Sequence, residues 1–174
     1  MPTTTPLIKV NRTKSYGAEV ILKGDCYDEA YEYATKLANE KGYTFIHPFN
    51  DEVLATGQGT IAMEIFKELP TVDIILAPVG GGGLLAGVAT MAKMLNPNIK
   101  IIGVEPAKAA CMKASLEAGH VVTLPNTDTI ADGTAVKTPG DIIFPYIQKY
   151  VDEIITVEDH ELVVNFLDII ENHK

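Results

Sequence analysis

The chain has 174 residues, of which 47% are hydrophobic and 21% charged, with a formal net charge of -9. This acidic balance, without a lysine- or arginine-rich block, argues against nucleic-acid binding, but a few backbone amides could still bind an anionic small molecule. No run of 18 apolar residues predicts a membrane span and the start lacks a signal-peptide pattern, so a cytoplasmic location is expected.

The first third of the chain alternates between strand-like and helical patterns. Residues 18–24 form a short β-branched run that predicts a strand. Residues 25–42 show helical spacing, with Asp25 as a candidate N-cap and Gly42 as the expected stop. Residues 43–47 predict a second strand.

The alternation continues to the end. Apolar spacing predicts a helix over residues 52–69, a strand over 72–79 and a helix over 84–95, in which an apolar stripe is expected at Leu84, Val88, Met91 and Leu95. The remaining segments are predicted as a strand (99–106), a helix (107–119), a loop (129–140), a helix (141–150), a strand (152–157) and a helix (158–174) that Glu158 or Asp159 caps. This alternation predicts an α/β fold with a mostly parallel sheet.

Four consecutive glycines, Gly80 to Gly83, stand between the third predicted strand and the next helix. A strand that runs into glycines and then opens a helix gathers free amide N–H groups and the positive end of the helix dipole at one point. The pattern therefore predicts a phosphate-binding loop. A tight turn that binds no ligand is the alternative.

The spacing around the glycines limits which phosphate is expected. A Walker A loop is excluded, because no Gly-Lys-Ser/Thr ending follows. A dinucleotide fingerprint is met only in relaxed form by Gly81, Gly83 and Ala86, with Glu105 placed where an acid could hold a ribose hydroxyl. A nucleotide-binding module is therefore kept as an alternative.

Several motifs, in the same order and spacing, carry a resemblance to a known family. They are "YGAEVILKG", "HPFND", "ATGQGTIAMEI", "PVGGGGLLAGVA", "GVEP" and "TIADGTAVKTPG". Together they resemble the threonine ammonia-lyase and serine racemase group of pyridoxal-phosphate enzymes, which have the tryptophan-synthase-β fold. The resemblance runs from about Pro2 to Lys174. The alternation of helices and strands pauses around Pro48 to Asp51, which predicts a boundary there. With the resemblance, residues 1–48 are expected to belong to a small inserted lobe and 49–174 to the large cofactor-binding domain.

The resemblance implies roles for individual residues. The phosphate of the cofactor would be held by the glycines and the residue after them, and the ring face would be lined by a later loop: Gly80, Gly81, Gly82, Gly83, Leu84, Asp132 and Gly133. Phe49 would lie near the substrate side chain. Gln58, with Gly59 and Thr60, would shape the wall behind the ring, although a packing role fits Gln58 and Thr60 equally. A structural role is expected for His47.

The same comparison implies that functional segments lie outside this sequence. The Schiff-base lysine of the family and the serine-and-asparagine loop that binds the substrate carboxylate would precede Met1, so we expect no catalytic residue here and no turnover by the isolated chain. A cation site in parts of the family would use Glu105 and the Ala109 carbonyl, but Cys111 stands where an aspartate is expected. This difference argues against a divalent metal and favours a monovalent ion or water at the site.

The function that the resemblance implies is deamination of L-threonine, or of L-serine, to a 2-oxo acid and ammonia. Racemisation of serine is the nearest alternative, and whether the role is biosynthetic or catabolic stays open. A non-catalytic fragment that completes a partner is a third hypothesis. Because an incomplete sheet exposes strand edges and apolar faces, we expect a dimer or other homo-oligomer.

Overall fold

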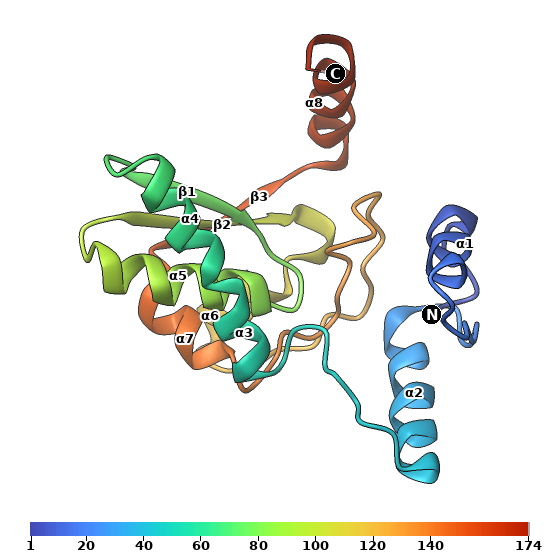
Figure 1. Ribbon diagram of the computed structural model, residues 1–174. Helices are drawn as coiled ribbons and strands as arrows, with labels where there is room; N and C mark the ends of the chain where they lie inside the picture. The colour runs from blue at the N-terminus through green and yellow to red at the C-terminus, as the bar shows by residue number, and fades with distance from the viewer. Residues whose placement is uncertain (174) are drawn as a thin grey trace. The chain divides into compact units, whose positions relative to one another are not determined.

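The computed structural model describes residues 1–173, and the chain divides into two compact units, Met1–Ile46 and His47–Lys174 (Figure 1). The division falls two residues before the boundary expected from the sequence. Lys174, the last residue of the predicted final helix, lies outside the described residues.

The first unit contains two helices, α1 (Leu7–Ser15) and α2 (Tyr27–Lys41). Helix α1 has no counterpart among the elements predicted from the sequence. Gly42 ends α2 in the left-handed conformation (φ 70°), as expected. The predicted N-cap was wrong: Cys26 occupies that position without a side-chain bond, and the Asp25 carboxylate instead accepts the Thr3 hydroxyl at 2.8 Å.

The two strands predicted in this unit are wrong, because residues 18–23 and 43–47 have no regular secondary structure. The first segment makes only isolated bonds, such as Met1 N to Ile21 O and Lys23 N to Met1 O, each 2.9 Å. β-Branched residues favour an extended backbone, but a strand needs a continuous ladder partner, which local sequence does not reveal.

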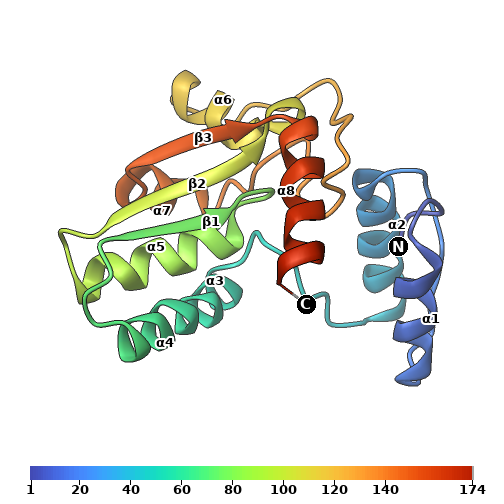
Figure 2. The ribbon, with the colours of Figure 1, turned by 90° about the horizontal axis from the view of Figure 1, so that it is seen from above.

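The second unit is built on a parallel sheet of order β1-β2-β3, formed by β1 (Ile74–Pro78), β2 (Lys100–Pro106) and β3 (Glu153–Val157) (Figure 2). Its register places Ala77 opposite Gly103 and Gly103 opposite Ile154. All three strands were predicted from their apolar runs, and the α/β class with a parallel sheet is confirmed.

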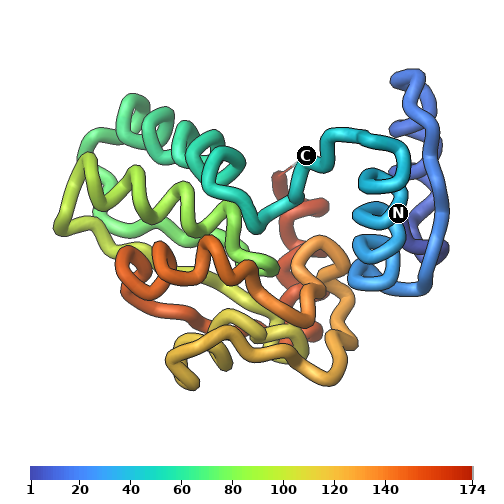
Figure 3. The backbone as a smooth tube through the Cα atoms, turned by 90° about the horizontal axis from the view of Figure 1, so that it is seen from below, coloured from blue at the N-terminus to red at the C-terminus, as the bar shows by residue number. Residues whose placement is uncertain are grey.

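Helix α5 (Gly83–Leu95) packs between α3 (Glu52–Gln58) and α4 (Thr60–Glu68) on one side and α7 (Phe144–Tyr150) on the other (Figure 3). The single helix predicted over residues 52–69 is broken at Gly59. A Cβ at Gly59 would lie 3.2 Å from the Gly87 carbonyl oxygen and 3.3 Å from the Met91 Cβ. Because glycine has no Cβ, the chain can pass close to α5 at this break.

The buried face of α5 differs from the predicted stripe. Leu95 is 51% exposed, and the residues that enter the core are mostly small: Leu85, Ala86, Val88, Ala89 and Ala92. Because the neighbouring helices approach closely on both sides, alanines and glycines fill this face, and the larger Leu84 and Met91 are only partly buried.

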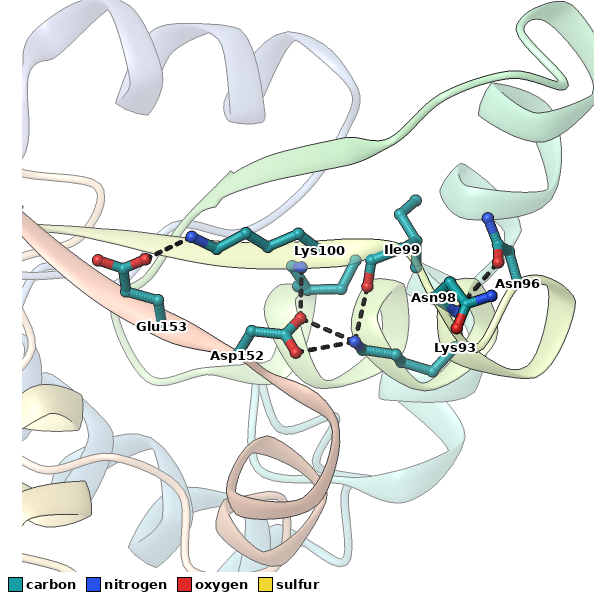
Figure 4. Close-up of polar contacts among 8 residues, drawn as sticks. Lys93, Asn96, Asn98, Ile99, Lys100, Asp152 and Glu153 are labelled. Carbon is teal, nitrogen blue, oxygen red and sulfur yellow. Dashed lines mark hydrogen bonds and ion pairs between the residues drawn. The ribbon is translucent and has the colours of Figure 1, made fainter.

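A polar cluster fixes the C-terminal end of α5 to the sheet (Figure 4). The Lys93 ammonium donates to the Ile99 carbonyl at 2.6 Å and pairs with the Asp152 carboxylate at 2.8 Å. Asp152 also accepts the Ile101 amide at 2.7 Å. The cluster therefore ties α5 to the first residues of β2 and to the segment that leads into β3.

The remaining elements are the short 3-10 helix η1 (Ala107–Ala109), α6 (Cys111–Ala118) and α8 (Asp159–Asn172), which extends away from the sheet after β3 (Figure 1). Glu158 caps α8 in a reciprocal box with Glu161, as expected. Among the described residues, no helix has the length and apolar character needed to cross a membrane.

Candidate cofactor-binding site

The glycine segment links the end of β1 to the start of α5. Val79 still bonds to the sheet, donating to the Val104 carbonyl at 2.9 Å, and α5 begins at Gly83. Between them Gly82 adopts φ 100°, which side chains rarely permit. The sequence expectation of a strand, a glycine turn and a helix is confirmed here.

Several backbone amides of this segment have no backbone acceptor. Within residues 1–173, the first amide at the start of α5 that donates a backbone hydrogen bond is that of Ala86, which bonds to the Gly82 carbonyl at 2.9 Å. The preceding amides, from Gly80 to Leu85, make no backbone bond in this part of the chain. Together with the helix dipole, these donors form a local site of positive potential that suits a phosphate.

The other surfaces of the segment are covered by protein atoms. A Cβ on Gly81 would overlap the Phe49 ring, and one on Gly82 would lie 2.5 Å from Met112 Cε and 2.6 Å from Ile143 Cδ1. Close packing therefore requires glycine at these positions whether or not a ligand binds. The unpaired amides, rather than the glycines themselves, are the feature that fits a phosphate.

The loop of residues 129–140 lies alongside the glycines. A Cβ on Gly80 would be 3.0 Å from Thr134 Cα, and the Gly140 amide donates to the Gly81 carbonyl at 2.9 Å. At the other end of the loop, the Thr129 hydroxyl donates to the Asp159 carboxylate at 2.5 Å. The structure thus brings the two predicted motifs together.

The two predicted ring-binding residues of that loop, Asp132 and Gly133, are exposed. A Cβ on Gly133 would meet no atom within 4 Å. Their proposed position over the cofactor ring stays a prediction.

The segment that carries Phe49 is held by its own side chains. The Nδ1 atom of His47 accepts the Asn50 amide at 2.8 Å and the Phe49 amide at 3.2 Å, which is the structural role expected for this histidine. Burial lowers its pKa, although Asp51 and Asp141 oppose the shift. The neutral ring is therefore favoured, in keeping with its role as an acceptor.

Asn50 is a residue that sequence reasoning missed. Its Nδ2 atom donates to the Asp141 carboxylate at 2.7 Å, and its Oδ1 atom accepts the Ile142 amide at 2.9 Å. These bonds join the Phe49 segment to the end of the 129–140 loop. An asparagine next to the predicted Phe49 was the only sequence signal.

The other predicted pocket residue, Gln58, lies against a different part of α5. A Cβ on Gly87, one turn beyond Gly83, would be 2.9 Å from the Gln58 Cβ, and the Thr60 hydroxyl donates to the Gly57 carbonyl at 2.8 Å. Both residues have the packing or turn role that the sequence left open, and a cofactor role for Gln58 stays a prediction.

Glu105, at the end of β2, is fully buried, and each of its carboxylate oxygens accepts one amide from the first turn of α6. The donors are Met112 N and Lys113 N, both at 2.9 Å. Burial raises the pKa of Glu105 to about 7, against the opposing effect of these two bonds. Both oxygens of the buried carboxylate are therefore used within the protein. The dinucleotide alternative needs an accessible acid to bind a ribose hydroxyl, and Glu105 is not accessible.

The two bonds of Glu105 also concern the doubtful cation site at Glu105 and the Ala109 carbonyl. Among residues 1–173, no group of three or more histidine, cysteine, aspartate or glutamate side chains could hold a metal. The Cys111 thiol lies 3.7 Å from the Gly80 carbonyl, at the distance of a weak S–H hydrogen bond. The cation site stays a prediction.

A parallel α/β sheet with unpaired amides between a strand and a helix N-terminus defines a class of anion-binding domains. Comparison with known proteins specifies the class. The family model described as "Pyridoxal-phosphate dependent enzyme" matches residues 1–174. The chain therefore belongs to the pyridoxal-phosphate dependent enzyme family.

Curated relatives include the L-threonine ammonia-lyases of Geobacter sulfurreducens (47% identical over 174 residues) and Thermotoga maritima (44% over 174 residues). Each match covers 100% of this chain but 43% of the relative, so the chain spans less than half of their length.

Similar solved structures include processed threonine deaminase isoform 2 of Solanum lycopersicum, with a TM-score of 0.92 at 43% identity. Maize serine racemase has a TM-score of 0.91 at 36% identity. These matches cover 99% and 98% of this chain and 50% and 51% of the respective structures, and they confirm the fold expected from the sequence motifs.

Proposed function

We propose that this chain forms part of a pyridoxal-phosphate-dependent ammonia-lyase that converts L-threonine to 2-oxobutanoate and ammonia. The observation that carries this proposal is the row of unpaired amides from Gly80 to Leu85, placed where the 47–51 and 129–142 segments meet. The sequence identities of 44% and 47% to two L-threonine ammonia-lyases, over all 174 residues, support L-threonine as the substrate.

In this proposal the residues of the chain bind and orient the cofactor. The amides of Gly80 to Leu84 hold the phosphate, Phe49 covers one side of the glycine segment, and Asp132 and Gly133 line the ring. When bound, pyridoxal phosphate supplies an electron sink that stabilises negative charge on the substrate α-carbon. The lysine and the substrate-carboxylate loop of the enzyme come from segments outside the matched region.

Serine racemisation is the second candidate, favoured by the similarity to maize serine racemase. The higher identity to the threonine enzymes makes deamination the first choice. We also infer a homo-oligomer, because Ile74 and Leu76 on the edge strand β1 are 49% and 58% exposed. A cytoplasmic location stays a prediction. Light scattering on a size-exclusion column tests the oligomer, and a monomer at high concentration would contradict it.

A chimera tests the activity directly. These 174 residues would replace the matched 43% of the Geobacter sulfurreducens L-threonine ammonia-lyase, which supplies the remaining segments. We expect release of 2-oxobutanoate from L-threonine, with less turnover of L-serine and no D-serine formed. A folded chimera that binds pyridoxal phosphate yet releases no 2-oxo acid would overturn the proposed activity.

A Gly81→Ala version of the chimera is expected to lose cofactor binding, because the new methyl group meets the Phe49 ring. Gly57→Ala is the matched control, since a Cβ at Gly57 meets nothing within 4 Å. Equal loss in both versions would contradict a specific role of the glycine segment.

A further inference from the structure

The first turn of helix α6 contacts the glycine segment at two points. The Cys111 thiol is 3.7 Å from the Gly80 carbonyl oxygen. A Cβ on Gly82 would be 2.5 Å from the Met112 side chain, so Met112 packs against the segment two residues further on. Both contacts come from the first two residues of the helix, so the position of its first turn constrains the glycine backbone.

The first turn of α6 is itself held by Glu105. A helix N-terminus leaves amides without intrahelical acceptors. Here Met112 N and Lys113 N each donate to one Glu105 oxygen at 2.9 Å, and no side chain of the N-cap residue Ala110 can replace this acceptor. The carboxylate is fully buried at the end of β2, so it connects the sheet rigidly to α6.

The contact at the Gly80 carbonyl sets the direction in which the Gly81 N–H points. The described chain has no cis peptide bond, and in a trans peptide the carbonyl and the following N–H point in opposite directions. A thiol that holds the Gly80 carbonyl toward α6 therefore turns the Gly81 N–H away from α6. This amide is one of the unpaired donors of the candidate phosphate site.

We propose that Glu105 is a positioning residue of the phosphate site: it anchors α6 so that Cys111 orients the Gly80–Gly81 peptide and aims the Gly81 amide at the anion. This role rests on the proposed function. It needs no cation, because both carboxylate oxygens are already used by the two amides.

The test uses the full chain and pyridoxine 5′-phosphate, which lacks the aldehyde and cannot react with lysines. In Glu105→Gln, one acceptor oxygen is replaced by an amide group that faces a backbone donor. We expect the ¹H–¹⁵N resonance of Gly81 to shift in phosphate-free buffer and the affinity for the probe to fall by about tenfold. Glu117→Gln, the same change at an exposed position of α6, is expected to alter neither.

A lowered melting temperature in Glu105→Gln, with the parent's Gly81 resonance and affinity, would overturn the proposal, since that is the signature of a purely structural carboxylate. If Glu105→Gln fails to fold, Cys111→Ala decides. This variant keeps Glu105 and loses only the thiol, and it is expected to shift the Gly81 resonance and weaken probe binding. A folded Cys111→Ala chain that matches the parent in both measurements contradicts the proposal.

The double variant Glu105→Gln/Cys111→Ala provides a further measurement, the coupling between the two effects on probe affinity. If both act through the orientation of one peptide, their effects on affinity are less than additive. Full additivity contradicts a shared path. A parent chain that does not bind the probe contradicts the candidate phosphate site instead, while the chimera still tests the proposed activity. The Gly81 resonance in phosphate-free buffer then still decides the positioning role.

Discussion

The amide of Gly140 donates a 2.9 Å hydrogen bond to the carbonyl of Gly81 and joins two motifs that lie far apart in the sequence. Because the peptide is trans, this bond also turns the Gly82 N–H away from Gly140. The loop that ends at Gly140 and the helix that starts at Cys111 thus hold consecutive carbonyls of the glycine segment. These two contacts turn the Gly81 and Gly82 amides away from α6 and from Gly140.

A methyl group at Gly82 is expected to be strongly destabilising. Gly82→Ala combines a left-handed backbone with overpacking against Met112 and Ile143, which together cost on the order of 3 kcal/mol. Urea unfolding followed by circular dichroism measures the loss. Gly57→Ala in α3 is the control and is expected to be neutral or slightly stabilising. Similar midpoints for the two variants would contradict the packing described for Gly82.

Asn50→Asp tests the bridge between the Phe49 segment and Asp141. In the parent chain the Asn50 Nδ2 atom lies 2.7 Å from the Asp141 carboxylate. The substitution keeps the shape of the side chain but places a carboxylate oxygen where this donor was. We expect a loss of about 2 kcal/mol at pH 7, which diminishes below about pH 4 as a carboxylate becomes protonated. Asn126→Asp, in an exposed loop, serves as the reference. A pH-independent loss would show that charge repulsion is not the cause.

Asp152 is expected to make stability depend on pH. Its burial raises the pKa, but bonds from Ile101 and Lys93 outweigh this effect and leave the pKa below its usual value. A carboxylate whose folded-state pKa is lowered stabilises the protein above its unfolded pKa of about 3.9, and this contribution is lost as the pH falls through the folded value.

Asp152→Asn should therefore unfold at lower urea concentration than the parent at pH 6, and the difference should shrink below about pH 4. Glu153→Gln removes only an exposed pair with Lys100 and is expected to have little effect at any pH. A gap between parent and Asp152→Asn that widens toward low pH would contradict the sign of this shift.

Divalent cations are expected to leave the chain unaffected, since Glu105 already uses both oxygens. Millimolar Mg²⁺ or Ca²⁺ should not change the melting temperature relative to a chelator-treated sample. A cation bound at Glu105 and the Ala109 carbonyl would instead raise it in proportion to the logarithm of concentration, because a ligand that binds only the native state stabilises it.

The sequence was sufficient to predict the sheet of the second unit. Buried parallel strands read as continuous apolar runs, and residues 74–78, 100–106 and 153–157 have that character. It failed for residues 18–24 and 43–47, whose extended pattern is the same locally but lacks a ladder partner. The buried face predicted for α5 was also partly wrong. Small residues such as Ala86 and Ala89 are buried there, because the neighbouring helices approach α5 closely.

The glycine segment and its neighbouring loop were predictable because several motifs matched one family in order and spacing. The bonds that orient the segment were not. Asn50 with Asp141, Cys111 with Gly80, and the two amides that Glu105 accepts are side-chain contacts between separate elements. Their formation depends on the tertiary arrangement, which local sequence patterns do not encode.

The phosphate site at the glycine segment can be tested most simply by an NMR titration of the ¹⁵N-labelled chain with pyridoxine 5′-phosphate. We expect saturable shifts of the amide resonances from Gly80 to Leu85, which persist in Gly57→Ala and vanish in a folded Gly81→Ala chain. If these six amide resonances stay unchanged during the titration, the glycine segment does not bind the phosphate. This holds whether or not resonances elsewhere in the chain shift.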